Sequence, residues 1–126
     1  MEPKCIMSEE KQRIVRETLG RIADKWTLVI IDELAGETLR FSELQRRIGK
    51  VSQKMLTQTL REMEADGLVQ RIVYAEVPPR VEYKLTKMGY TLGEAVCSIW
   101  KWVEKNHKEI QRSRLKKSSQ SSSPSL

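Results

Sequence analysis

Apolar residues recur at helical spacing near the start of the chain. Residues 9–20, with Ile22 beyond them, predict a first helix that Gly20 is able to interrupt. Asp24 is a favourable N-cap for a second helix, which we expect to end near Gly36. Since this second segment is apolar on most of its faces, we expect it to lie at the buried centre of the domain.

Two shorter helical patterns follow, separated by a tight turn. The first covers Phe41–Ile48, where apolar residues are spaced by three and four, and Gly49 ends it. Ser52 is a plausible N-cap for the next helix, which runs to about Asp66 and closes at Gly67. A short helix, a tight turn and a second helix form the arrangement of a helix-turn-helix.

The pattern then changes to that of β-strands. Residues 68–74 and 81–85 are rich in β-forming residues, and the loop between them holds a pair of prolines, so we predict a hairpin with a stiff tip. Thr86 is placed to cap a last long helix that reaches about Gln111. The predicted fold class is therefore mainly α with a small β-hairpin, a winged helix-turn-helix from about Trp26 to Leu85.

The ends of the chain differ from this central region. We interpret residues 1–8 as a flexible arm and residues 9–111 as the winged helix-turn-helix domain with its last helix. Residues 112–126 form a basic, Ser-rich tail that is too polar to pack, and we expect it to be disordered.

The composition of the chain limits the classes of fold and site that it is able to form. The chain has 126 residues, 39% apolar and 32% charged, as expected for one globular domain. It holds no apolar stretch long enough for a membrane span or a signal peptide, so we expect a cytoplasmic protein that does not bind membranes. Two distant cysteines and a single histidine predict neither a disulfide framework nor a metal site.

The positive charge is concentrated in two places. Of the net charge of +6, residues 108–126 account for +4, with five basic residues and one acidic residue. Residues 40–61 contain six basic residues and only Glu43 against them, a local net charge of +5. This region forms either a patch that faces phosphates or a solvated helix face.

The helix after Ser52 carries the candidate reading surface. If Leu56, Leu60 and Met63 face inward, a set of polar side chains suited to base edges in the major groove faces outward. The outward residues are Lys54, Thr57, Gln58 and Arg61. The first turn, with Ser52 and Gln53, offers backbone N–H groups to a phosphate, and Arg40 belongs to the same basic region. An amphipathic surface helix also shows such residues, but the preceding helix and turn favour DNA contact.

Arg80 at the hairpin tip is a second candidate contact. It follows Pro78 and Pro79, and a stiff tip ending in arginine suits a minor groove or a phosphate. The alternative is an ordinary loop whose arginine pairs with Glu76 or Glu82.

Five segments in sequence resemble a known family. They are DKWTL at residues 24–28, RFSEL at 40–44, VSQKMLT at 51–57, LREMEADGLV at 60–69 and EVPPRVEYKLT at 76–86, followed by Gly89. Together they are similar to the signature segments of the HxlR-type regulators, which are related to the MarR type. The resemblance covers about residues 20–105.

The resemblance implies a homodimeric winged-helix repressor or activator. Its first and last helices make the dimer, and two recognition helices enter successive major grooves of a pseudo-palindrome in double-stranded DNA. Carried over by position, the DNA-reading residues are Ser52, Gln53, Lys54, Thr57, Gln58 and Arg61, with Arg80 on the wing.

The last helix supplies candidate residues for the dimer interface. Leu92, Val96, Ile99 and Val103 form one apolar stripe, and Cys97 lies beside it on a line with Gly93 and Trp100. This line suggests a second buried surface, in which a free cysteine acts as a small apolar residue. An aromatic-lined ligand pocket around Trp100 and Trp102 is the alternative.

The chain departs from the family at its N-terminus. Many members sense oxidants through a cysteine about 13 residues before the tryptophan of the first segment, where this chain has Arg13. Cys5 lies further upstream and is followed by Ile6, so we interpret it as a bystander in preference to a redox sensor. A small molecule or an electrophile as effector is a partner that the family allows.

The sequence shows no catalytic constellation and requires no cofactor, so we expect a non-enzyme. The favoured function is a sequence-specific DNA-binding transcriptional regulator, with repression favoured over activation. The alternatives are a winged-helix module for protein contact and a non-specific architectural DNA binder, the second of which binds all sequences alike.

Overall fold

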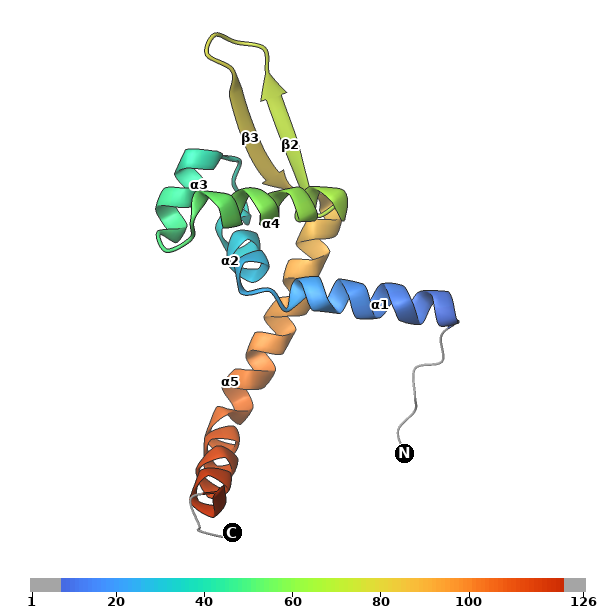
Figure 1. Cartoon of the computed structure of the whole chain (residues 1–126), viewed down its shortest axis with the longest axis vertical. Helices are drawn as coiled ribbons and strands as arrows, with labels where there is room; N and C mark the ends of the chain where they lie inside the picture. Colours follow the sequence, from blue (N-terminus) through green and yellow to red (C-terminus); the bar gives the residue numbers. More distant parts are fainter. Residues whose placement is uncertain (1–7, 122–126) are drawn as a thin grey trace. The chain divides into compact units, whose positions relative to one another are not determined.

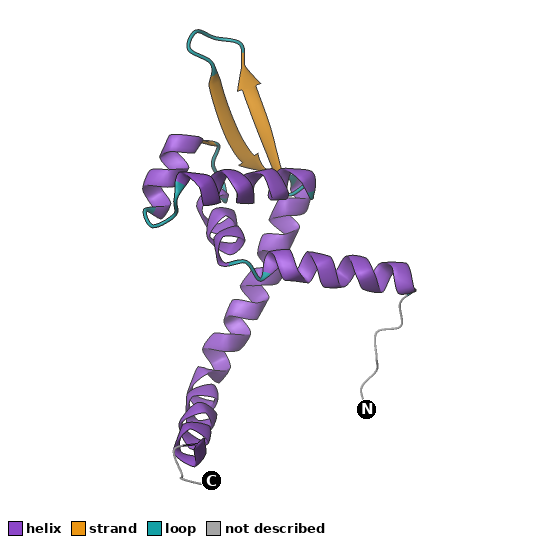
Figure 2. Ribbon diagram, viewed as in Figure 1, coloured by secondary structure: helices purple, strands orange, loops and turns teal. Residues whose placement is uncertain are grey.

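The structure of the chain is a computed structural model that describes residues 8–121 (Figure 1). Figure 2 shows that these residues are mainly helical, with one hairpin. The elements in chain order are α1 (Glu9–Ile22), α2 (Lys25–Leu34), β1 (Leu39–Arg40), α3 (Phe41–Ile48), α4 (Gln53–Ala65), β2 (Val69–Tyr74), β3 (Arg80–Leu85) and α5 (Lys87–Ser121). The predicted order of helices and hairpin is confirmed.

Capping side chains start the helices where the sequence predicts them. The Asp24 carboxylate accepts a hydrogen bond from the Trp26 N–H at 2.8 Å, and the Ser52 hydroxyl accepts one from the Met55 N–H at 3.1 Å. Each cap satisfies one of the backbone donors that a helix leaves free in its first turn. Gly49 ends α3 with φ of 82°, a left-handed conformation that favours glycine in the turn before α4.

A single apolar core holds α2, α3, α4 and the sheet together. Ile30 and Leu34 of α2, Leu44 of α3 and Leu56 of α4 are fully buried in it. The prediction that α2 lies at the centre agrees with this burial. α1, in contrast, has no buried residue and is joined to the end of α4 by an ion pair between Arg21 and Asp66.

The sheet has three antiparallel strands in the order β1-β3-β2. The hairpin register pairs Val69 with Leu85 and Tyr74 with Arg80. β1 was not expected from the sequence, because a strand of two residues carries no readable alternation. It adds to the outer edge of β3 through Leu39, opposite Tyr83, and so ties the start of α3 to the hairpin.

Two further differences concern the helices. Gly20 does not interrupt α1, which continues to Ile22. The tail that we expected to be disordered from residue 112 is helical to Ser121, so the predicted boundary at residue 111 is wrong. Residues 108–121 contain neither glycine nor proline and several good helix formers, which allows α5 to continue.

The chain divides into two compact units, the first ending at Gly93 and the second beginning at Glu94. The first unit holds the core, the sheet and the first turns of α5, and the second holds the rest of α5. Among the described residues, no helix is both long enough and apolar enough to span a membrane.

Candidate nucleic-acid interface

One side of α4 is fixed in the core. Leu56, Leu60 and Met63 are buried, as the helical spacing predicts. Thr59 is buried with them, and its hydroxyl donates to the Met55 carbonyl oxygen at 2.9 Å. Because this bond satisfies the hydroxyl within the helix itself, a polar residue is tolerated in the core. Thr59 was missing from the predicted inward face, which was set from three apolar residues alone.

The opposite side of α4 is open. Lys54, Gln58 and Arg61 are exposed, and Thr57 is half-buried at the edge of the same face. Neither Lys54 nor Arg61 forms an ion pair with another described residue. The structure therefore brings together the four side chains that the sequence assigns to base reading, and among the described residues neither of the two cations is neutralised.

The first turn of α4 is also exposed. Gln53 is exposed, and so is Ser52, whose hydroxyl oxygen accepts from the Met55 N–H. The hydroxyl proton of Ser52 is not used by this cap. The positive end of the α4 dipole therefore lies beside two polar side chains, a combination that attracts anionic groups.

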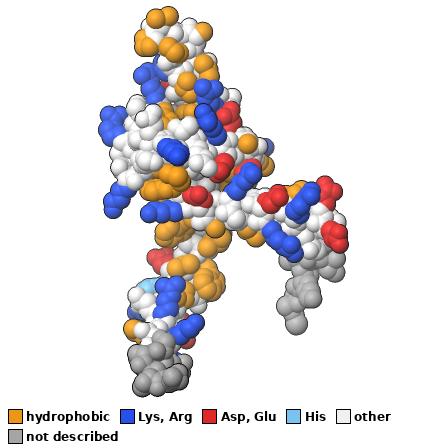
Figure 3. All heavy atoms as spheres, in the orientation of Figure 1, with side chains coloured by type: hydrophobic (Ala, Val, Ile, Leu, Met, Phe, Trp, Pro, Cys, Tyr) orange, Lys and Arg blue, Asp and Glu red, His pale blue; other side chains and the backbone are white. Residues whose placement is uncertain are grey.

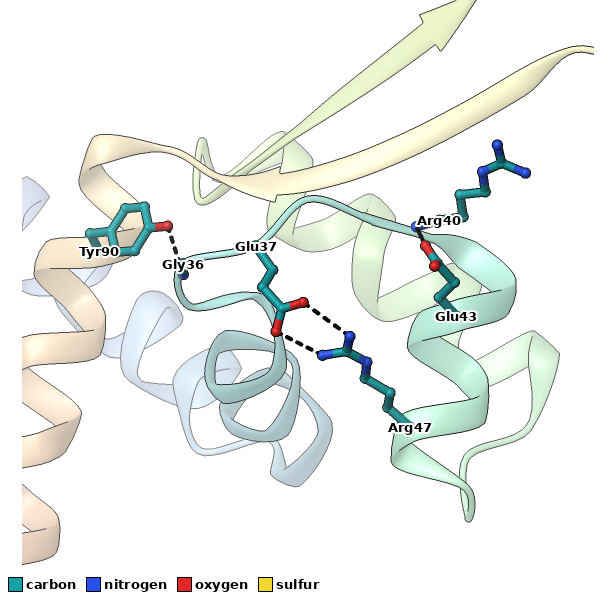
Figure 4. Close-up of polar contacts among 6 residues, drawn as sticks. All are labelled: Gly36, Glu37, Arg40, Glu43, Arg47 and Tyr90. Atoms are coloured by element: carbon teal, nitrogen blue, oxygen red, sulfur yellow. Dashed lines mark hydrogen bonds and ion pairs between the residues drawn. The ribbon is translucent and has the colours of Figure 1, made fainter.

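Not all of the basic residues between 40 and 61 are free. Arg47 of α3 donates two hydrogen bonds to the Glu37 carboxylate, at 2.8 and 3.0 Å (Figure 4). This hydrogen-bonded pair lowers the pKa of Glu37 and raises the pKa of Arg47. Arg47 therefore fixes α3 to the loop after α2, a role that composition alone does not reveal.

Arg40 stands at the start of α3. Its backbone N–H donates to the Glu43 carboxylate at 2.8 Å, which caps the helix. Its exposed guanidinium makes no contact with the other labelled residues in Figure 4 and points away from Arg47. Among the described residues Arg40 has no ion-pair partner, which suits a phosphate-facing position.

Arg80 is held against the hairpin. Its Cζ lies 4.0 Å from the centre of the Tyr74 ring, and its Nη2 lies 3.3 Å from the Glu76 carboxylate. Glu82 is a second ionic neighbour, with 3.7 Å between its carboxylate and Nε. The ion pairs that we considered as the alternative for Arg80 are therefore present, and 30% of its side chain remains exposed.

Arg40 and Arg80 meet at a cleft of about 470 Å³ between the start of α3 and the hairpin loop. Phe41 and Ser42 line it on the α3 side, and residues 76–81 line it on the loop side. The cleft thus holds two guanidinium groups and one carboxylate, that of Glu76, and the remaining positive charge suits a phosphate.

The residues assigned to the dimer interface differ in how far they are exposed. Leu92 packs against the core of its own chain, unlike Ile99 and Trp100, which are 61% and 66% exposed. Cys97 and Val103 are also exposed, and Val96 is half-buried. Cys97 is a free thiol. Cys5, the weaker candidate for redox sensing, lies outside the described residues.

The first unit also has a cleft beside α1. It has a volume of about 470 Å³ and is mostly apolar, with Ile14, Ile22 and Leu68 among its lining residues. Trp100 and Trp102 are not among these residues, so this cleft is not the aromatic-lined pocket that we considered from the sequence.

The family model for HxlR-like helix-turn-helix proteins matches residues 21–111. The uncharacterized HTH-type transcriptional regulator YtfH of Escherichia coli is 44% identical over 95 residues, which are 75% of this chain and 75% of that protein.

Solved structures give the same result for the fold. A structure described as a MarR-family transcriptional regulator from Enterococcus faecalis is 42% identical, with a TM-score of 0.72, and the match covers 86% of this chain and 99% of that one. The redox regulator HypR in its oxidized form is 43% identical, with a TM-score of 0.64 and coverage of 73% and 95%. These similarities confirm the predicted winged helix-turn-helix.

Proposed function

The chain belongs to the family of HxlR-like helix-turn-helix proteins, and from this premise we propose that it is a sequence-specific repressor that binds a pseudo-palindromic operator as a homodimer. That it is a transcriptional regulator of the helix-turn-helix type follows from the family and from its relatives. The specificity, the repression and the dimer are our proposal.

The observation that carries the proposal is the outward face of α4. Arg and Lys donate to guanine, and Gln pairs with adenine, so Lys54, Gln58 and Arg61 suit direct reading of bases in a major groove. Thr57 at the edge of this face reaches a phosphate or a thymine methyl. A module for protein contact needs an apolar or acidic face here, which these side chains do not provide.

Phosphate contacts position this helix. We assign them to the first turn of α4, with Ser52 and Gln53, and to the cleft that Arg40 and Arg80 line. Glu76 and Glu82 form ion pairs with the Arg80 guanidinium. Because a guanidinium has five N–H donors, some of them remain for a phosphate. Arg80 in this proposal both stiffens the wing and contacts DNA.

The homodimer is supported by the exposed apolar surface of α5. Ile99, Trp100 and Val103 are large side chains that a single chain leaves in water. A second copy of α5 packed on the same face buries them, and two-fold symmetry then presents two copies of α4 to a two-fold operator. If this operator lies in a promoter, the simplest effect of a bound dimer is to repress transcription.

A redox switch is left out of the proposal. HypR is a redox regulator, but this chain has Arg13 at the position where the resemblance places the sensing cysteine. We therefore assign neither Cys5 nor Cys97 a sensing role.

The test begins with selection of binding sites from random duplex DNA by the full chain. Affinities for the selected site and for a scrambled site are then compared at one salt concentration in wild type, Arg61→Ala and Lys54→Ala. Because one good bidentate base contact supplies about 1–3 kcal/mol of discrimination, we expect each variant to lose about 5- to 150-fold of the preference for the selected site.

Arg16→Ala is the matched control. Arg16 is an exposed arginine of α1, so its removal changes the net charge as Arg61→Ala does but leaves the α4 face intact. Preserved preference in Arg61→Ala and Lys54→Ala contradicts the assigned reading face. Binding of wild type to all duplexes with equal affinity supports the architectural alternative, and no binding to DNA supports the module for protein contact.

A further inference from the structure

A line of basic side chains runs along the second unit of the chain. Its members are Lys101, Lys105, Lys108, Arg112 and Lys116, which we call the α5 basic line. They follow one another at spacings of three and four residues, so a rotation of 100° per residue keeps all five within about 80° of arc. All five side chains are exposed.

Four apolar residues of α5 lie on the other side of the helix. Val96, Ile99, Val103 and Ile110 fall on a line centred about 180° from the α5 basic line. If the apolar line is covered by a second copy of α5, the basic line faces away from that contact. In Figure 3, hydrophobic atoms line part of α5 and Lys and Arg atoms lie towards its C-terminal end.

Acidic side chains do little to neutralise the line. Glu104 and Glu109 flank it, about 80° and 60° away around the helix. Within the described part of the chain, the line makes one ion pair, from Arg112 to Glu109 at 3.5 Å, with both side chains 72% exposed. An exposed pair at this spacing is weak, so Arg112 is held only loosely. The other four members of the line have no ionic partner among the described residues. An ordinary solvated helix face mixes both signs of charge.

The dimensions of the line match those of a nucleic-acid backbone. From Lys101 to Lys116 a helix rises about 22 Å, and each DNA strand carries one phosphate per about 3.4 Å of duplex axis. The line is therefore about as long as six base pairs of duplex, so several backbone phosphates on the facing side lie along it. Lysine and arginine side chains are long and flexible enough to reach phosphates that do not lie directly opposite them.

A membrane surface fits the same charge less well. A helix that binds an anionic bilayer inserts its apolar face between the lipids, with basic residues on the opposite or flanking side. In the proposed dimer, that apolar face is covered by a second copy of α5. A polyanion that needs only the basic face is the better match, and the chain already presents a DNA-reading face on α4.

We propose that the α5 basic line of Lys101, Lys105, Lys108, Arg112 and Lys116 binds the phosphate backbone of double-stranded DNA without reading its sequence. The proposal rests on the DNA-binding function proposed above and adds a second, sequence-independent contact to it. Its consequence is stronger binding to specific and random duplexes alike, with a steeper dependence on salt.

The test compares two double variants of the full chain. Lys108→Gln with Arg112→Gln removes two cations from the line. Arg114→Gln with Lys117→Gln removes one lysine and one arginine from the same end of α5, but both lie more than 100° from the centre of the line. Affinity is measured over a range of salt concentrations on the selected operator and on a random duplex.

For the line variant we expect at least about tenfold weaker binding to both duplexes. The slope of log affinity against log salt should fall by about 0.9 for each phosphate contact removed. The control variant should change by less than about threefold. Circular dichroism and light scattering should show unchanged helix content and oligomeric state in both variants.

Three results overturn the proposal. Equal losses in the two variants mean that net charge alone matters, and no loss in the line variant means that the line does not contact DNA. The third is loss of binding to phosphatidylserine vesicles with unchanged affinity for DNA, which assigns the line to a membrane surface. Failure of the proposed operator specificity is seen separately, as the absence of sequence preference in wild type, because the line is tested on the random duplex.

Discussion

At the residue scale, the junction between the hairpin and α5 depends on two side chains. The Thr86 hydroxyl donates to the Gly67 carbonyl oxygen at 2.6 Å and accepts from the Gly89 N–H at 3.0 Å. The second bond caps α5, as the sequence predicts for Thr86. Gly89 lies against the backbone at Leu68, so a single threonine and a single glycine join the end of α4, the sheet and α5.

A first prediction concerns Gly89. In Gly89→Ala, the new Cβ would collide with the Leu68 carbonyl oxygen and lie 3.2 Å from Leu85 Cδ2. Alanine gains about 1 kcal/mol of helix propensity over glycine, but overpacking against backbone costs about 1–3 kcal/mol or more. We therefore expect a net loss of about 1–2 kcal/mol in the free energy of unfolding, measured by urea denaturation.

Gly20→Ala is the control for this substitution. Gly20 is also helical, and nothing lies within 4 Å of the position its Cβ would take. It should raise stability by up to about 1 kcal/mol. Equal effects of the two substitutions would show that the close approach at Leu68 is not limiting.

At the scale of elements, α3 is held by contacts outside itself. It spans only Phe41–Ile48, a length at which an isolated helix is not stable in water. Leu44 anchors it in the core, the bidentate pair between Arg47 and Glu37 fixes it to the loop after α2, and β1 ties its start to the hairpin. The position of α4 relative to α3 depends on these anchors and on the core that both helices share.

The ion pair of α3 predicts a dependence of stability on pH. Because the hydrogen bond from Arg47 lowers the pKa of Glu37 in the folded state, the pair stabilises the fold above the ordinary carboxyl pKa of about 4.5. This contribution is lost as the pH falls through the lowered pKa. Wild type should therefore exceed Glu37→Gln in thermal midpoint at pH 7, and the difference should shrink below about pH 4.5.

The same comparison in an Arg47→Ala background isolates the pair. There Glu37→Gln should have a smaller effect at pH 7 and little pH dependence, since the carboxylate has lost its partner. A pH dependence that persists without Arg47 would assign the lowered pKa to another cause. The effect is expected to be modest, because both side chains are more than 40% exposed.

At the scale of the whole molecule, a single chain leaves large apolar side chains of its second unit exposed to water. In the described part of that unit, Ile99, Trp100, Trp102 and Leu115 are all more than half exposed. A soluble monomer rarely leaves such a series of large apolar residues on one helix in water. The proposed self-association through α5 would cover Ile99 and its neighbours on the apolar line, and it is also what the proposed two-fold operator requires.

Ile99→Asp tests this association. Ile99 is 61% exposed in the single chain, so the change should leave the fold of the first unit intact while placing a charge in the proposed interface. We expect light scattering to show a monomer and operator affinity to fall by at least about 100-fold, because the two half-sites are no longer bound together.

Leu115→Asp is the matched control for the dimer. Leu115 is 71% exposed, but it lies about 140° from the line that Val96, Ile99, Val103 and Ile110 form. This variant should remain dimeric in the same light-scattering measurement. A dimer in both variants would place the interface outside the apolar line of α5.

Several features were determined by the sequence alone, because they depend on neighbouring residues. Asp24, Ser52 and Thr86 cap their helices through bonds that reach only two or three residues along the chain. The buried and open faces of α4 follow from 3.6 residues per turn, so the candidate reading face was predictable side chain by side chain.

Other features were decided by the tertiary structure, because they join residues that lie far apart. β1 exists only through its register with β3, and Gly89 is required only because Leu68 lies against it. Local charge could not show that Arg47 and Arg80 have carboxylate partners while Arg40, Lys54 and Arg61 form no ion pair within residues 8–121. The sequence supplied the chemistry of the interface, and folding decided which of its cations are available to a partner.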